Sequence, residues 1–189
     1  VGCDCDRYFE VWNLVFTQFD RQEDGSLKDL PRTNIDTGMG LERLAMVAQG
    51  KKSTFETDLF WPIMEQAAGI IGKRPDESAE TGLAFRVIGD HTRASMMLIP
   101  EGVVPSNEGR GYVLRRLIRR AARYGRLHGV KGAFVHKLVP AALSIYKGVY
   151  DEPAAHRKEI EETIRAEEER FLETLETGER LLAGLLERH

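Results

Sequence analysis

Residues 110–131 hold a block of basic residues that also has the periodicity of an amphipathic helix. No acidic residue interrupts this block. At about 100° of rotation per residue, the arginines from Arg115 onward fall within an arc of ~140°, and apolar residues such as Leu114 and Ile118 occupy the opposite arc. The six arginines of this arc are Arg115, Arg116, Arg119, Arg120, Arg123 and Arg126. The pattern predicts a helix with one face in a core and the other face made of arginine.

The chain is acidic on both sides of this block, although its formal net charge is only −3. Residues 102–150 carry a net charge of +9, whereas residues 1–101 and residues 151–189 each carry −6. A solvated charged face usually mixes signs to gain ion pairs. An arginine face without acids therefore favours contact with a polyanion such as RNA. The acidic C-terminal residues are the competing partner, and some of the arginines could pair with them instead.

Composition excludes several classes of protein. With 42% hydrophobic residues among 189, the chain can bury a core, which excludes a disordered tail. No apolar run approaches the roughly 20 residues that cross a bilayer, so no membrane partner is expected. Cys3 and Cys5 lie too close together for an ordinary structural disulfide, which favours a reducing, cytoplasmic location. The chain does not begin with Met, and we expect it to be part of a longer protein.

The hydrophobic pattern predicts an α+β fold in which strands precede helices. Residues 8–19 form an apolar run with little alternation, typical of a strand buried on both faces. Asp24-Gly25 predicts a turn, and two short extended segments follow on either side of Pro31. Three strands need further strands from upstream to complete a sheet. A polar loop at residues 72–82 predicts a boundary. The segments with helical periodicity are 40–48, 58–68, 83–98, the stretch after Gly111, 133–146 and 153 to the C-terminus.

The segment IDTGMGLERLA, residues 35–45, is the most informative stretch of the chain. It places an acid at the end of a strand, then two glycines, then an arginine at the start of a helix. Glycines leave the backbone open to a ligand, and a helix N-terminus favours phosphate. An arginine can grip phosphate or stack on a base. The alternative is a strand-to-helix turn whose glycines only relieve strain.

This segment resembles motif 3 of the class II aminoacyl-tRNA synthetases, in the form that alanyl-tRNA synthetases use. Three further segments resemble the same family: residues 3–21 (CDCDRYFEVWNLVFTQFDR), residues 53–63 (STFETDLFWPI) and residues 85–129. The resemblance implies the C-terminal part of a class II antiparallel sheet, with motif 3 forming a strand and a helix, followed by an all-α domain. The implied division is a catalytic part at 1–72 and a helical tRNA-recognition domain at 73–189.

The resemblance also implies an activity. The family to which the segment is similar activates L-alanine with ATP and Mg²⁺ and transfers it to tRNA(Ala). Motifs 1 and 2 and the editing domain are expected outside this chain, so the chain by itself should not catalyse the reaction. A non-catalytic RNA-binding helical module derived from a synthetase is the alternative, and a helical module that binds a protein partner is a third reading.

Several residues match binding positions of the family. Asn13 and Asp36 match the pair that holds the amino group of alanine, although spacing alone would leave Asn13 as a hydrogen-bonded core residue. Val15 and Gly38 match positions beside the alanine methyl group. The residues expected to bind ATP are Gly38, Gly40 and Arg43.

Asn107 lies in the loop PSNEG, where a cap or a turn is the default role of an asparagine. In the family, an asparagine of this loop helps to read the G·U wobble pair of the acceptor stem, and the minor groove of RNA is shallow enough for such a contact. The residues expected to bind tRNA are therefore Asn107, Arg110 and the six arginines of the arc. The second reader of the family, an aspartate, is expected beyond His189.

Cys3 and Cys5 supply at most two of the four ligands of a zinc site. Further cysteines upstream would have to complete it. The five histidines form no ligand-like cluster in the sequence. Zinc at Cys3 and Cys5 is thus an open alternative.

Overall fold

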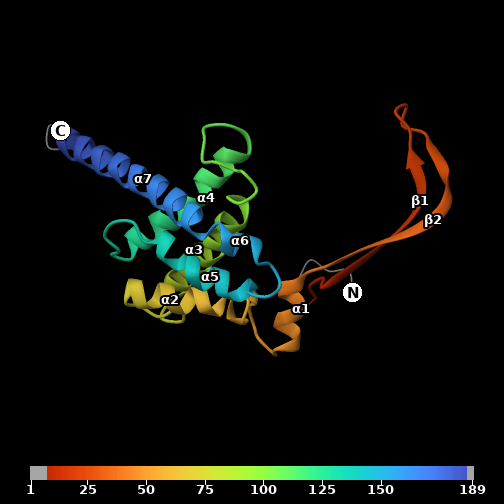
Figure 1. The fold of residues 1–189 in the computed structure, drawn as a ribbon, viewed down its shortest axis with the longest axis horizontal. Coiled ribbons are helices and arrows are strands. Elements are labelled where there is room, and N and C mark those ends of the chain that lie inside the picture. The colour runs from red at the N-terminus through yellow and green to blue at the C-terminus, as the bar shows by residue number, and fades with distance from the viewer. Residues whose placement is uncertain (1–7, 187–189) are drawn as a thin grey trace. The chain divides into compact units, whose positions relative to one another are not determined.

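The computed structural model describes residues 8–186, which fall into two compact units, Val1–Thr57 and Asp58–His189 (Figure 1). The first unit contains a two-stranded antiparallel sheet and a short helix. The second unit is helical. This architecture confirms the predicted α+β class.

The first unit is built on the hairpin of β1 (Trp12–Arg21) and β2 (Leu27–Met39). The predicted turn is present. Gly25 has φ +84°, a conformation that suits glycine. Oδ1 of Asp24 accepts a hydrogen bond from the backbone N–H of Ser26 at 2.9 Å. Helix α1 (Leu41–Ala48) follows β2 directly, and a single 3₁₀ turn, η1 (Thr54–Glu56), ends the unit.

Strand β2 is continuous, which corrects the prediction of two extended segments separated by Pro31. Thr17 pairs with Asn34, but Phe19 pairs with Asp29, so β2 bulges between these two pairs. Residues 30–33 occupy the bulge. Because a bulged residue makes no ladder hydrogen bond, Pro31 can lie inside the strand without its missing N–H being needed.

The prediction that the first strand is buried on both faces is wrong for this chain. Trp12 and Phe16 on one face are 53% and 67% exposed, and Val15 on the other face is 53% exposed. The reason is that the sheet has two strands within the described residues, so neither face is covered by a further layer. The apolar run was read correctly as a strand, but its burial depends on elements that this unit does not contain.

The second unit follows the predicted helices closely. Helix α3 (Ala79–Leu98) begins after Ser78, whose Oγ accepts the N–H of Thr81 at 3.1 Å, and α2 (Trp61–Ile71) ends before Gly72, which has φ +73°. The predicted helix at 133–146 is divided into a 3₁₀ turn and α5 (Val139–Tyr146), and the last helix is preceded by the short α6 (Glu152–Ala155). The elements are α2 (Trp61–Ile71), α3 (Ala79–Leu98), α4 (Gly109–Leu127), η2 (Val135–Leu138), α5 (Val139–Tyr146), α6 (Glu152–Ala155) and α7 (Arg157–Leu186).

The core of the second unit forms where α3, α4 and the N-terminal half of α7 meet. Phe85 and Ile88 of α3, Ile118 of α4, and Ile160 and Ile164 of α7 have no exposed surface. The buried residues of α7 all lie between Ile160 and Leu172. Its C-terminal end extends beyond the other helices of the unit in Figure 1. None of the described helices is long and apolar enough to span a membrane.

The compact units divide between Thr57 and Asp58, whereas the sequence predicts the functional boundary between residues 72 and 73. Helix α2 lies between these two positions. It packs into the helical core, with Ile63, Met64 and Ala67 buried. A Cβ atom on Gly89 of α3 would lie 3.1 Å from the sulfur of Met64, so the two helices are in close contact. The assignment of residues 1–72 to a catalytic domain stays a prediction.

Candidate substrate and RNA-binding sites

The hairpin register brings together the four residues expected to bind alanine. Asn13 of β1 lies directly opposite Gly38 of β2, and Val15 lies directly opposite Asp36. Side chains alternate along a strand, and directly opposed residues point to the same face of an antiparallel pair. The four positions therefore form one continuous patch on a single face of the hairpin, although Asn13 and Asp36 are 23 positions apart in the sequence.

The patch is open and carries one negative charge. Both Asn13 and Asp36 are exposed. The Nδ2 group of Asn13 donates a weak hydrogen bond, 3.3 Å long, to the Glu10 carboxylate. A Cβ atom on Gly38 would meet no atom within 4 Å. The arrangement offers a carboxylate and an amide oxygen beside empty space, which suits a small ammonium compound.

Gly40 and Arg43 stand at the junction of the hairpin and α1. Gly40 is the N-cap of α1 and makes no side-chain cap, so the first-turn N–H groups of the helix have no side-chain acceptor there. The N–H of Gly40 donates to the Val11 carbonyl at 2.9 Å, and Nη1 of Arg43 donates to the Glu10 carbonyl at 2.5 Å. This hydrogen bond holds the Arg43 side chain against the segment just before β1. That segment is close to Asn13 in the sequence.

The arginine helix exists as predicted. Helix α4 buries the face that contains Leu114, Ile118, Ala121 and Ala122, each of which is at most 2% exposed. The arginines lie on the remaining surface of the helix and are exposed or partly buried. The periodicity therefore predicts the buried face at these four positions, whereas Val113, which falls on the same apolar arc, is 53% exposed.

The arginine face has two parts, and the part that contains Arg119 and Arg126 contacts α7. Nε of Arg119 lies 2.6 Å from Oε1 of Glu167, and Arg126 lies 2.8 Å from the Glu179 carboxylate. The competing hypothesis, that the acidic C-terminal helix pairs with some arginines, is confirmed for these two. The prediction that Arg119 and Arg126 also touch RNA stays untested, but both side chains already have carboxylate partners.

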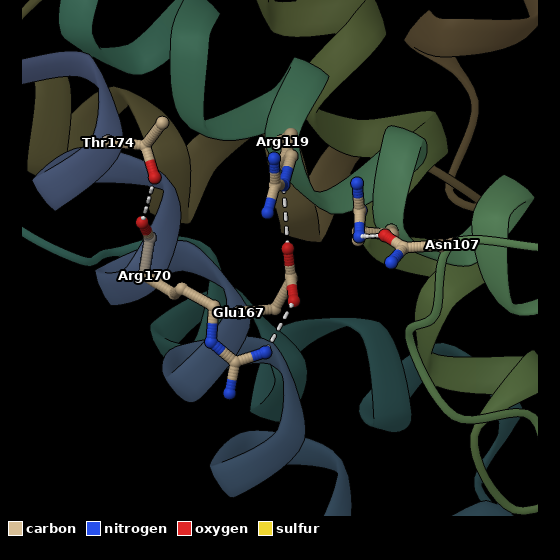
Figure 2. Close-up of polar contacts among 6 residues, drawn as sticks. Asn107, Arg119, Glu167, Arg170 and Thr174 are labelled. Atoms are coloured by element: carbon tan, nitrogen blue, oxygen red, sulfur yellow. Dashed lines mark hydrogen bonds and ion pairs between the residues drawn. The ribbon is translucent and has the colours of Figure 1, made fainter. Parts of the chain in front are cut away.

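Glu167 is the central residue of this contact (Figure 2). Its side chain is 2% exposed and lies between Arg119 and Arg170, whose Nη1 is 3.4 Å away. The Arg119 guanidinium also lies over the ring of Phe171, with 5.4 Å between the guanidinium carbon and the ring centroid. A buried carboxylate with two cationic partners fixes α4 against α7.

The second part of the arginine face is free of ion pairs. Arg116, Arg120 and Arg123 are exposed, and none of them has a carboxylate within 4 Å in the part of the chain that the structure describes. On a helical wheel centred on Arg115, they lie at about 80–140°, whereas the arginines paired with α7 lie within ~40°. Arg110, at the start of the helix, is exposed as well.

Asn107 lies in the loop before α4, and its side chain is held by that helix. Nη1 of Arg115 donates a hydrogen bond to Oδ1 of Asn107. Asn107 itself is exposed, whereas Arg115 is partly buried. The side chain is thus neither a helix cap nor a free loop amide. Figure 2 shows it apart from the Glu167 cluster.

Sequence reasoning missed Glu167 and Glu168, both of which are buried. The two carboxylate oxygens of Glu168 accept the backbone N–H groups of Phe134 and Val135, each at 3.0 Å, and so hold the start of η2. A signal was present in the sequence. Ile160 and Ile164 define a helical seam, and positions seven and eight residues after Ile160 should continue it. Glutamates at two seam positions indicate buried, partnered carboxylates.

Neither the zinc hypothesis nor any other metal site gains support. Cys3 and Cys5 lie outside the described residues. Within residues 8–186 there is no cluster of three or more His, Cys, Asp or Glu side chains that could hold a metal ion. Zinc at the two cysteines stays a prediction.

Comparison with known proteins identifies the family. Residues 1–189 match the family described as tRNA synthetases class II (A). The alanine–tRNA ligase of Endomicrobium trichonymphae is 53% identical over 97% of this chain, and that of Elusimicrobium minutum is 49% identical over the whole chain. The chain spans about a fifth of the length of these relatives, 21% and 22%. With its motif 3 hairpin and helix and a match along its full length, the chain belongs to the class II tRNA synthetases.

Proposed function

We propose that this chain is the part of a cytoplasmic alanine–tRNA ligase that binds L-alanine on its hairpin and the acceptor stem of tRNA(Ala) on its helical unit. The names of its relatives and the identity of about 50% support this reading. The single observation that carries the amino-acid site is the strand register, which places Asn13, Val15, Asp36 and Gly38 on one face.

Each residue of this face has a physical role toward alanine. The Asp36 carboxylate neutralises the ammonium group of the substrate, and the Asn13 amide oxygen accepts a second N–H from it. Gly38 and Val15 shape the space for a methyl group. A small apolar pocket discriminates against one methyl or one hydroxyl by only about 1–3 kcal/mol. Rejection of glycine and serine therefore requires a separate editing site.

The residues at the start of α1 fit a nucleotide. Gly38 and Gly40 have no side chains to obstruct an approaching ligand, the helix N-terminus favours phosphate, and Arg43 supplies a planar cation. When bound, ATP with Mg²⁺ supplies the activated phosphate for adenylation. The residues of this chain bind and orient the two substrates beside each other, which is itself a large contribution to such a reaction.

The exposed arginines of α4 form the proposed RNA contact. Arg116, Arg120 and Arg123 repeat along one side of the helix, none with a carboxylate within 4 Å among the described residues, although the charge of Arg120 also acts on Asp90. An exposed arginine row of this kind binds a phosphate backbone. The proposed RNA-recognition domain begins near residue 73 and contains this helix. Asn107 at its N-terminal end supplies the base contact.

The test is alanine-dependent pyrophosphate exchange in the full-length ligase that contains this segment. Asp36→Ala should abolish exchange, since the ammonium of alanine loses its counter-ion. Asp29→Ala is the matched control, because Asp29 is an exposed aspartate of the same strand that pairs with Phe19 instead. A near-normal KM for alanine in Asp36→Ala would refute the assignment. Loss of exchange in both variants would indicate that the hairpin misfolds.

The alternative of a non-catalytic RNA-binding module makes the opposite prediction. In that case the full-length protein would bind acceptor-stem RNA but would show no alanine-dependent exchange, with or without Asp36.

A further inference from the structure

The loop that carries Asn107 lies directly against the first turn of α4. A Cβ atom on Gly111 would lie 2.3 Å from both Oγ of Ser106 and the carbonyl oxygen of Val104, a distance that no real side chain tolerates. Gly111 is buried, so the loop backbone occupies the space where a side chain would be. Oγ of Ser106 also donates to the Glu108 carbonyl at 2.9 Å. The backbone is therefore fixed on both sides of Asn107.

The Asn107 side chain is fixed by a different residue. Arg115 is eight positions further on, and it lies six residues after the first residue of α4, about 9 Å along the helix axis. Its side chain leans toward the N-terminus of α4, as helical side chains do, and its Nη1 donates to Oδ1 of Asn107. A guanidinium group has five N–H donors and no acceptor. The Asn107 oxygen must therefore face Arg115, and the Nδ2 amino group points away from it.

We propose that Arg115 is a positioning residue for base recognition, which orients the Asn107 carboxamide so that its NH₂ group donates to an acceptor atom on the minor-groove edge of the acceptor stem. This inference rests on the proposed function of Asn107 as a base reader. A free carboxamide can rotate by about 180° and exchange its donor and acceptor with almost no change of shape. Arg115 removes that ambiguity, because only one orientation satisfies both groups.

Arg115 differs in this respect from the other arginines of the same arc. Arg119 and Arg126 are held by glutamates of α7. Arg116 and Arg123 are exposed without a carboxylate partner among the described residues, and Arg120 is exposed with its charge acting on Asp90. Arg115 is partly buried, and it donates a hydrogen bond to an amide oxygen. A phosphate contact would not require that arrangement.

The experiment compares charging of G·U and G·C minihelices by the full-length ligase. The variants are Asn107→Ala, Arg115→Met, Arg115→Lys and the double variant Asn107→Ala/Arg115→Met. Arg123→Met, on the exposed side of the same helix, is the control for loss of an arginine charge. Thermal unfolding of each variant shows whether it is folded.

We expect Asn107→Ala to reduce the G·U over G·C preference in kcat/KM by roughly 10-fold, the size of one base contact. Arg115→Met should reduce it by a similar factor and should add nothing in the double variant, because it acts through Asn107. Arg115→Lys keeps a donor and should keep part of the preference. Arg123→Met should lower charging of both stems alike.

Three results would distinguish a failure of the positioning role of Arg115 from a failure of the base-reading role of Asn107. If Arg115→Met lowered both stems equally and independently of Asn107, Arg115 would be a phosphate contact and the positioning role would be refuted. If Asn107→Ala lost the preference while Arg115→Met kept it, the positioning role alone would fail. If Asn107→Ala kept the full preference, the base-reading role in the proposed function would fail first, and the inference with it.

Discussion

The Arg119 guanidinium donates to the Glu167 carboxylate across the contact of α4 and α7, with 2.6 Å between Nε and Oε1. Arg123, one turn further along the same helix, is exposed and makes no such contact. The two arginines look equivalent in the sequence, since both belong to the arc opposite the apolar face. Their different surroundings lead to different expected phenotypes.

Arg119→Ala should destabilise the helical unit. It would leave the buried Glu167 carboxylate with Arg170 alone, at 3.4 Å, and removal of one partner of a buried ion pair costs about 3 kcal/mol or more. Arg123→Ala should change the free energy of unfolding by less than about 0.5 kcal/mol, as is usual for an exposed position. Urea denaturation followed by circular dichroism measures the free energy of unfolding of both variants. Equal stabilities for the two variants would contradict the structural role of Arg119.

The same pair should behave in the opposite order toward RNA. Arg123→Ala should weaken binding to any acceptor stem and should reduce the slope of log affinity against log salt by roughly one phosphate contact. Binding isotherms of the chain with a minihelix at three salt concentrations provide the measurement, and Lys158→Ala, at an exposed position of α7, serves as the control. An unchanged salt slope for Arg123→Ala would exclude it as a phosphate contact.

Glu168→Ala should destabilise the helical unit more than Glu169→Ala. Glu168 has no exposed surface and accepts two backbone N–H groups, and its loss would leave both donors buried without a partner. Each lost hydrogen bond of a charged group costs about 1.5–3 kcal/mol. Glu169 is exposed, and its ion pair within the described residues is a surface contact with Arg165 at 3.9 Å, which is worth little. Melting temperatures of the two variants decide the question, and similar values would refute the anchoring role.

Acid should weaken the helical unit through Asp90. A hydrogen bond from the His91 ring, 2.9 Å long, and then the positive charges of His91, Arg93 and Arg120 hold the pKa of Asp90 below its usual value of 3.8. A lowered pKa in the folded state means that the stabilisation is present above pH 3.8 and is lost as the pH falls through the folded-state pKa. Asp90→Asn should therefore have a shallower dependence of stability on pH below 3.8. An identical slope for both proteins would show that Asp90 does not contribute.

Gly38→Ala should spare the fold and impair alanine binding. The new Cβ atom would meet nothing within 4 Å in the hairpin and would not be strained by a positive φ, but it would extend into the space beside Asn13 and Asp36. We expect the KM for alanine to rise at least 10-fold and the KM for ATP to change less. Pyrophosphate exchange with each substrate varied in turn measures the two constants. An unchanged KM for alanine would place the substrate on another surface.

Much of the local structure could be predicted from the residues. The end of α1 before Gly50, the turn at Asp24-Gly25 and the buried face of α4 all depend on contacts within a few residues. Periodicity and turn chemistry report such contacts directly. The motif around Asp36 was specific enough to indicate the family, which the comparison of full-length matches then confirmed.

Other features depended on partners that are distant in the sequence. The bulge that admits Pro31 follows from the register between β1 and β2, and the exposure of β1 follows from the two-stranded sheet. The sequence places Glu167 and Glu168 on the apolar seam of the last helix. It does not show which groups form hydrogen bonds with their carboxylates.

By itself the sequence determined which residues lie on which face of each element, because the 3.6-residue and two-residue periods are local geometry. The tertiary structure decided the role of each arginine. Arg119 forms an ion pair with a buried carboxylate, and Arg115 donates a hydrogen bond to Asn107, whereas Arg123 is exposed to solvent. These residues share one helix face and one chemistry. Only the packing of α7 and of the loop before α4 distinguishes them, because the interactions of a charged side chain depend on the atoms placed within a few ångströms of it.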